Sequence, residues 1–176
     1  ILLMGFSTIP VSADEEIYSV SDFEEFKAAV EEINAKTSDG TYTISLTGDI
    51  DFGSTGYNCK FYKNTEIFGN GHIINLGGEM SNGQLQIRDG AVLSLGKSNS
   101  TGSENQLKIT VAAPKRSTAL ILVGNTNPEK ACTLNMYDGV ELTGSSTNGA
   151  SLGSAVNIVN GQFNMYGGDI HGNTND

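Results

Sequence analysis

One short sequence motif recurs along the chain and constrains its fold more than any other feature. Each copy consists of an apolar residue, a polar residue, a second apolar residue, any residue and a turn dipeptide that ends in glycine. Clear copies begin at Leu85, Leu134 and Phe163, and a weaker copy begins at Glu66. A strand this short buries too few side chains to be stable alone, whereas stacked parallel copies share backbone hydrogen bonds and one core. The repeat therefore predicts a parallel coil with about 20 to 30 residues per rung.

The motif also assigns side chains to the inside of the coil. Because alternate residues of a strand point to opposite faces, the apolar positions of each copy are expected to face inward. The predicted inward columns are Leu85, Leu134 and Phe163, and Ile87, Met136 and Met165. An antiparallel β-sandwich is the competing architecture, but it gives no reason for one local motif to repeat at one corner.

One segment has helical periodicity. Apolar residues recur at helical spacing from Phe23 to Ile33, and mostly acidic side chains fill the opposite face. Ser21 and Glu24 match a capping box with Ser21 as the N-cap, which predicts a helix over 22–36. This amphipathic helix precedes the coil and is placed to cover the unpaired backbone at its first end. We interpret its acidic face as solvated surface.

The first thirteen residues resemble the remnant of a signal peptide. Ile1–Ile9 is apolar and uncharged, Pro10 ends that run, and Val11 and Ala13 are the small residues of a signal-peptidase site before Asp14. The prediction is cleavage between Ala13 and Asp14, secretion, and no membrane insertion beyond the signal peptide. A buried N-terminal strand is the alternative interpretation.

Charge and cysteine content restrict the possible partners and cross-links. Ten basic residues against twenty acidic ones give a net charge of −10, which argues against nucleic acid or an anionic membrane as the main partner.

Cys59 and Cys132 fit no metal-binding or CxxC spacing. A secreted location permits a disulfide between them, and two buried small hydrophobic residues are the alternative.

The segment 153–174 contains a strand, an Asn-Gly turn, an alternating strand and a Gly-Gly-x-Ile-x-Gly-Asn-Thr ending. In this order of elements it resembles a recurrent rung of bacterial surface proteins with right-handed parallel β-helices, of the pectate-lyase-like superfamily. The region from the helix to His72 is similar to the N-terminal cap and first rungs of the same proteins. The resemblance covers residues 17–176. It implies an all-β fold, a right-handed parallel β-helix or solenoid with an N-terminal amphipathic capping α-helix.

The expected organisation has one folded unit. Residues 1–13 are the signal-peptide remnant, 14–40 the N-terminal segment with the capping helix, and 41–176 the β-helix rungs. The last rung ends in polar residues without a capping element, so the coil is expected to continue beyond Asp176.

The resemblance also includes polysaccharide-cleaving enzymes, whose chemistry requires particular residues. The lyases of this superfamily combine acidic calcium ligands with an Arg or Lys base, and this chain has Arg88 and Arg116 without an acidic cluster beside either. Of the sequence elements of the related hydrolases, only Asn-Thr-Asn-Asp at 173–176 is faintly similar. No catalytic residue is predicted in this chain.

One pair of carboxylates is a candidate metal site. Asp49 and Asp51 share a strand face at i and i+2 and would hold calcium if a third ligand joined them. The alternative is the solvated face of an early strand. No other cofactor is predicted, and His72 and His171 are interpreted as surface or corner histidines.

The outward positions of the motif form a candidate glycan-binding face. If the inward columns are as predicted, then Asn135, Tyr137, Asn164 and Tyr166 point outward, and Gln86 and Arg88 extend the same face. Tyrosine rings and amides on a flat sheet suit sugar rings and their hydroxyls. A tyrosine ladder that only stabilises strand pairing is the alternative.

Two classes of function follow. The first is a secreted or surface-displayed, non-catalytic β-helix module that acts as an adhesin or scaffold, with an extracellular glycan or a host or cell-surface protein as partner. The second is the N-terminal part of a polysaccharide lyase or glycoside hydrolase whose catalytic rungs lie beyond residue 176.

Overall fold

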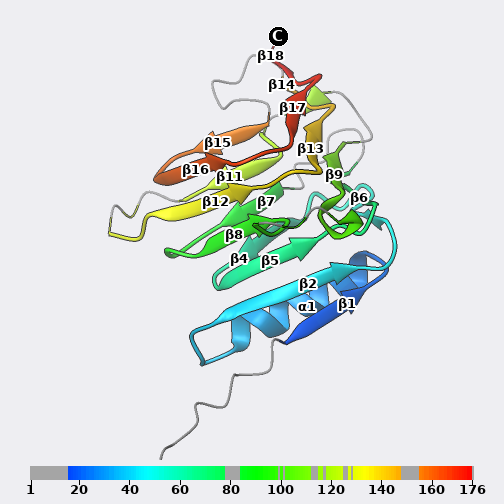
Figure 1. Ribbon diagram of the computed structural model, residues 1–176. Coiled ribbons are helices and arrows are strands. Elements are labelled where there is room, and N and C mark those ends of the chain that lie inside the picture. Colours follow the sequence, from blue (N-terminus) through cyan, green and yellow to red (C-terminus); the bar gives the residue numbers. More distant parts are fainter. Residues whose placement is uncertain are drawn as a thin grey trace, which may run out of the picture.

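A computed structural model describes residues 16–77, 84–98, 100, 102–111, 115–116, 118–124, 127, 129–147 and 155–175 (Figure 1). These residues form mostly β-structure, together with one α-helix, α1 (Phe23–Ala35), and a one-turn 3-10 helix, η1 (Ser103–Asn105). The prediction of a largely all-β chain with one amphipathic α-helix near its start is therefore confirmed. Within the described ranges, no helix is both long and apolar enough to cross a membrane.

The described strands form four sheets in which every pairing between them is parallel. Sheet A has the order β1 (Ile17–Val20), β2 (Thr41–Leu46), β5 (Asn64–Phe68), β8 (Val92–Leu95), β12 (Cys132–Met136) and β16 (Gly161–Met165). Sheet B has the order β3 (Ile50–Asp51), β6 (His72–Asn75), β9 (Leu107–Thr110), β13 (Val140–Thr143) and β17 (Asp169–His171). Sheet C has the order β4 (Asn58–Phe61), β7 (Gln84–Ile87), β11 (Ile121–Val123) and β15 (Val156–Ile158). Sheet D has the order β10 (Lys115–Arg116), β14 (Ser146–Thr147) and β18 (Thr174–Asn175).

The chain visits the sheets in a fixed order. From β2 onward it passes through sheets A, B and C and returns to A, and from β9 onward it also passes through D between B and C. Each new strand pairs with the strand laid down one passage earlier, so the passages stack (Figure 1). We call the segment from one sheet A strand to the next a rung. Register partners in sheet A follow one another as Ile44, Ile67, Leu95, Met136 and Met165, so a rung takes between 23 and 41 residues.

The core consists of columns of apolar side chains that run through the stacked rungs. Leu134 pairs with Phe163 and Met136 with Met165, as predicted. The predicted places of Leu85 and Ile87 in these columns are wrong. Both lie in β7 of sheet C, and Leu93 and Leu95 hold the corresponding positions of sheet A. The reason is that the turn at Asp89 and Gly90 leads from sheet C to sheet A, whereas the turn after β12 leads from sheet A to sheet B.

Helix α1 covers the first end of the stack. Its apolar face, with Phe26, Val30 and Ile33 fully buried, packs against β1, β2, β3 and β4. The N-cap is Asp22 and not the predicted Ser21, because Asp22 accepts a hydrogen bond from the Glu25 backbone N–H at 2.9 Å. The helix ends at Ala35, in agreement with the predicted limit near Lys36.

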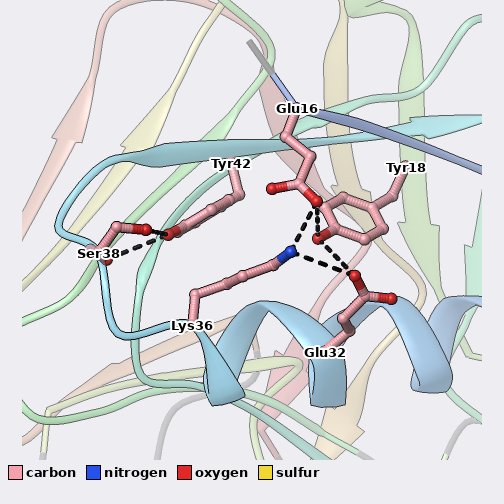
Figure 2. A network of polar contacts seen from close by, with 6 residues as sticks. All are labelled: Glu16, Tyr18, Glu32, Lys36, Ser38 and Tyr42. Atoms are coloured by element: carbon pink, nitrogen blue, oxygen red, sulfur yellow. Dashed lines mark hydrogen bonds and ion pairs between the residues drawn. The ribbon is translucent and has the colours of Figure 1, made fainter. Parts of the chain in front are cut away.

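A polar network fastens β1 to α1 (Figure 2). Lys36 Nζ donates to Glu16 Oε1 at 2.7 Å and to Glu32 Oε1 at 3.2 Å. The Tyr18 hydroxyl donates to the same two carboxylates, at 2.8 and 3.1 Å. Burial, together with the hydrogen bonds to these carboxylates, raises the pKa of Tyr18 to about 12. The hydrogen bond from Lys36 lowers the pKa of Glu16.

Both cysteines of the chain lie in the interior of the stack. Cys59 and Cys132 are buried free thiols on sheets C and A, as in the interpretation of small hydrophobic residues. Burial raises the pKa of the Cys59 thiol.

Asn105 of η1, almost fully buried, accepts from the Lys97 backbone N–H and donates to the Lys97 carbonyl oxygen, both at 2.9 Å. Asn105 thereby closes the loop that connects β8 to β9.

Candidate functional site

The outward face of sheet A carries an amide ladder. Because Leu134 and Met136 point inward, Asn135 between them points outward. Asn164 Nδ2 donates to Asn135 Oδ1 at 3.0 Å, and Asn135 Nδ2 donates to Ser94 Oγ at 3.3 Å. The ladder therefore links three consecutive strands, β8, β12 and β16, through their outward side chains.

A stacked tyrosine pair lies beside the ladder. Tyr137 and Tyr166 directly follow β12 and β16, and their ring centroids are 5.1 Å apart with the planes 15° from parallel. Tyr166 is 64% exposed, whereas burial, with Tyr166 and Glu66 nearby, raises the pKa of Tyr137. Since each ring covers a face of the other, the pair offers a ligand the outer face of Tyr166 and the two hydroxyl edges. The structure thus brings together the four residues predicted to line this face.

Gln86 and Arg88 do not extend this face, and that part of the prediction is wrong. Both lie in or directly after β7 of sheet C. Gln86 is buried, and Arg88 donates to Gln86 Oε1 at 2.6 Å and to the Gly124 carbonyl oxygen at 2.8 Å. Their contacts make them part of a hydrogen-bonded network within sheet C. The error follows from the misplaced column, because the two residues were expected to alternate with Leu85 and Ile87 in sheet A.

The sequence reasoning did not include Phe68 and Lys97 in this face. Register partners Ile67, Leu95 and Met136 place Phe68, Gly96 and Tyr137 at the next position of three consecutive strands. Lys97 Nζ lies 5.9 Å from the Phe68 ring centroid. The weak copy of the motif that begins at Glu66 contained the signal, since its third residue, Phe68, is aligned with the tyrosines.

The predicted metal ligands lie at the edge of a shallow hollow on sheet B. Asp49 Oδ1 accepts from the Ile73 backbone N–H at 3.0 Å and lies 3.2 Å from His72 Nδ1. Asp51 Oδ1 accepts from the Gly53 backbone N–H at 2.9 Å and from Asn75 Nδ2 at 3.1 Å. These two carboxylates line the same hollow together with Asn75. In the part of the chain that the structure describes, no group of three or more His, Cys, Asp or Glu side chains could hold a metal ion.

A second charged cluster on sheet B was missed by the sequence reasoning. Glu141 Oε1 lies 2.7 Å from His171 Nε2 and 3.3 Å from Lys108 Nζ, so three consecutive rungs contribute one residue each. Burial would raise the pKa of Glu141, but the hydrogen bonds from His171 and Lys108 outweigh it and the pKa is lowered. Both histidines of the chain therefore contact a carboxylate of the preceding rung. Only the register of sheet B brings these residues together, and no local motif signals it.

Ala13 and Asp14, the predicted cleavage site, lie outside the described residues, so cleavage stays a prediction.

Compared with protein-family models, with curated proteins and with solved structures, the chain has no match in any of the three.

Proposed function

We propose that the chain is a right-handed parallel β-helix, a solenoid whose first end is covered by α1. The proposal is supported by the fixed order of sheets, the parallel pairing of successive passages and the apolar columns at register positions. Right-handedness follows from the general preference of parallel crossover connections. The resemblance of residues 17–176 to pectate-lyase-like surface proteins agrees with this fold and remains part of the proposal.

The proposed function is that of a secreted or surface-displayed, non-catalytic module that binds an extended glycan along sheet A. One observation carries the proposal: the amide ladder and the stacked tyrosines repeat side by side on consecutive strands. Sugars are recognised by amide groups that bond hydroxyls and by exposed aromatic rings that cover their apolar faces. A linear polymer of sugars that lies across the strands would meet both kinds of group on the two consecutive strands β12 and β16.

Glycan binding is tested by removing the two rings. The double variant Tyr137→Ala, Tyr166→Ala should lose binding at least about tenfold in affinity electrophoresis against a panel of soluble polysaccharides, equal to about 1.4 kcal/mol. Tyr62→Ala is the matched control, because Tyr62 is also exposed, follows β4 in sheet C, and donates its backbone N–H to Asn34 Oδ1 at 2.9 Å, a hydrogen bond that the substitution retains. Equal binding by wild type and double variant, or no binding by wild type to any polysaccharide, contradicts the proposal.

Secretion is tested separately. The mature protein collected outside the cell should begin at Asp14 when its N-terminus is sequenced. A secreted protein that retains residues 1–13 would show that the apolar segment is not a cleaved signal peptide.

A further inference from the structure

The tyrosines that directly follow β12 and β16 form a ring pair held in place by the backbone of sheet A. All six tyrosines of the chain lie within the described residues, and among them only Tyr137 and Tyr166 stack on each other. Their ring centroids are 5.1 Å apart and the planes are 15° from parallel. Met136 pairs with Met165 just before them, and the Tyr166 backbone N–H donates to the Met136 carbonyl oxygen at 2.9 Å. The register of the two strands therefore fixes the distance between the rings.

The hydroxyl groups of this pair differ from those of other tyrosines of the chain. The Tyr18 hydroxyl is bonded to two carboxylates, and the Tyr42 hydroxyl donates to the Ser38 carbonyl oxygen at 3.1 Å. Among the described residues, neither the Tyr137 nor the Tyr166 hydroxyl has a hydrogen-bond partner. Both phenols can therefore lose a proton to water, and both rings can tilt without breaking a hydrogen bond to the described chain.

We propose that Tyr137 and Tyr166 are an oxidative cross-linking site, at which a haem peroxidase and hydrogen peroxide join the two rings. Each phenol loses one electron and one proton and becomes a phenoxyl radical. The two radicals form a carbon–carbon bond between one Cε atom of each ring, and the proton on each of these carbons then moves to the oxygen, which restores both phenols. The chain loses two hydrogen atoms in total, and hydrogen peroxide takes up the two electrons and two protons to become two molecules of water.

The stacked geometry favours a bond within one molecule over a bond between molecules. Two groups held side by side react at a far higher effective concentration than two groups that must meet by diffusion. The product is a covalent link between two rungs that are far apart in the sequence, and such a link stabilises a fold mainly by restricting the unfolded chain. Further chain after β16 would cover the outer face of Tyr166 and would leave the contact between the two rings unchanged.

The test is peptide mapping of the full chain after treatment with a haem peroxidase and hydrogen peroxide. Proteolytic cleavage before aspartate places Tyr137 in fragment 89–137 and Tyr166 in fragment 138–168. In the oxidised wild type the two fragments should stay joined, with the mass of their sum less two hydrogen atoms and with the fluorescence of dityrosine. The yield of the joined fragment per chain should not change with protein concentration, because the bond forms within one molecule.

Two conservative variants locate the bond. Tyr166→Phe keeps the stacked ring but cannot form a phenoxyl radical, so the joined fragment should disappear. Tyr62→Phe removes an exposed tyrosine of sheet C and should leave the yield of the joined fragment unchanged. Oxidised wild type whose two fragments separate overturns the proposal, whether its tyrosines are unmodified or consumed in links between molecules. A joined fragment of equal yield in Tyr166→Phe overturns it as well.

This proposal and glycan binding fail separately. The cross-link requires the two hydroxyls and the distance between the rings, and it requires no bound sugar. Glycan binding in the untreated protein is measured without any oxidant, so the result of either experiment leaves the other proposal as it stands.

Discussion

Gly69 lies so close to the neighbouring rung that a side chain has no room. A Cβ atom built on Gly69 would come within 2.6 Å of the Leu107 Cα atom. Gly69→Ala should therefore lower the free energy of unfolding by about 1–3 kcal/mol, the usual cost of forcing extra atoms into a packed site. Gly40→Ala is the control, because no atom lies within 4 Å of a Cβ there. Urea denaturation of both variants measures the difference, and equal stabilities would show that the rungs separate easily.

Glu141 gives the protein a defined dependence on pH. Its folded pKa lies below the ordinary value of 4.5 because His171 and Lys108 stabilise the carboxylate. The resulting stabilisation is present above pH 4.5 and is lost as the pH falls through the lowered folded pKa. Glu141→Gln should therefore be less stable than wild type at neutral pH and should lose less stability on acidification.

The measurement for Glu141 is chemical denaturation across the acidic range. Glu24→Gln, on the exposed face of α1, controls for the loss of one carboxylate. A slope of stability against pH that is the same in Glu141→Gln and wild type would mean that solvent screens the cluster completely.

The candidate site could be predicted where residues are neighbours within one motif. Asn135 and Tyr137 follow from the alternation around Leu134 and Met136, and their partners follow from the identical spacing around Phe163. Gln86 and Arg88 have the same local pattern, yet they lie on sheet C. A local pattern fixes which way a side chain points from its strand, but the register between distant rungs decides which sheet the strand joins.

Strand β1 is held at the edge of sheet A by contacts from a different element. It pairs with β2 on one side, and Lys36 beyond the end of α1 bonds Glu16 just before it (Figure 2). Lys36→Met should therefore release β1 while the rest of sheet A remains folded. Hydrogen exchange should show faster exchange confined to β1.

Lys27→Met is the control for Lys36→Met. Lys27 lies on α1 itself, and its Nζ is 5.6 Å from the centroid of the ring of Tyr57, which directly precedes β4. If both variants exchange alike in β1, the parallel pairing with β2 alone holds the strand.

The strands differ in how far their own sequence predicts them. The sequence predicts β8 at Val92–Leu95 and β15 at Val156–Ile158, because each alternates between clear turn residues. Val140 and Leu142 of β13 alternate in the same way directly after Asp138 and Gly139. β1 has one buried residue, Val20, so its position depends on β2 and α1 more than on its own apolar pattern.

Within the described residues, α1 covers the first rung, whereas β15, β16 and β17 of the last described rung each pair on one side only, which should produce a gradient of local stability along this chain. In a stacked array each rung is stabilised by its neighbours, and local opening starts where few contacts are made. Hydrogen exchange of this chain should be fastest in β15, β16 and β17 and slowest in the central strands β7 and β8. Uniform protection along the chain would indicate a single cooperative unit.

Asn105 closes the loop between β8 and β9 by its two hydrogen bonds to the backbone of Lys97. This closed loop allows the surface of the protein to change independently of its packed core. The rung that contains it takes 41 residues where another takes 23, and the sheet A strands on either side still pair in register. Residues inserted into this loop would change the surface of the protein without changing the side chains that pack in its core. The length of this loop can therefore vary at little risk to folding, and sequence comparison among homologues should find length variation concentrated at this corner.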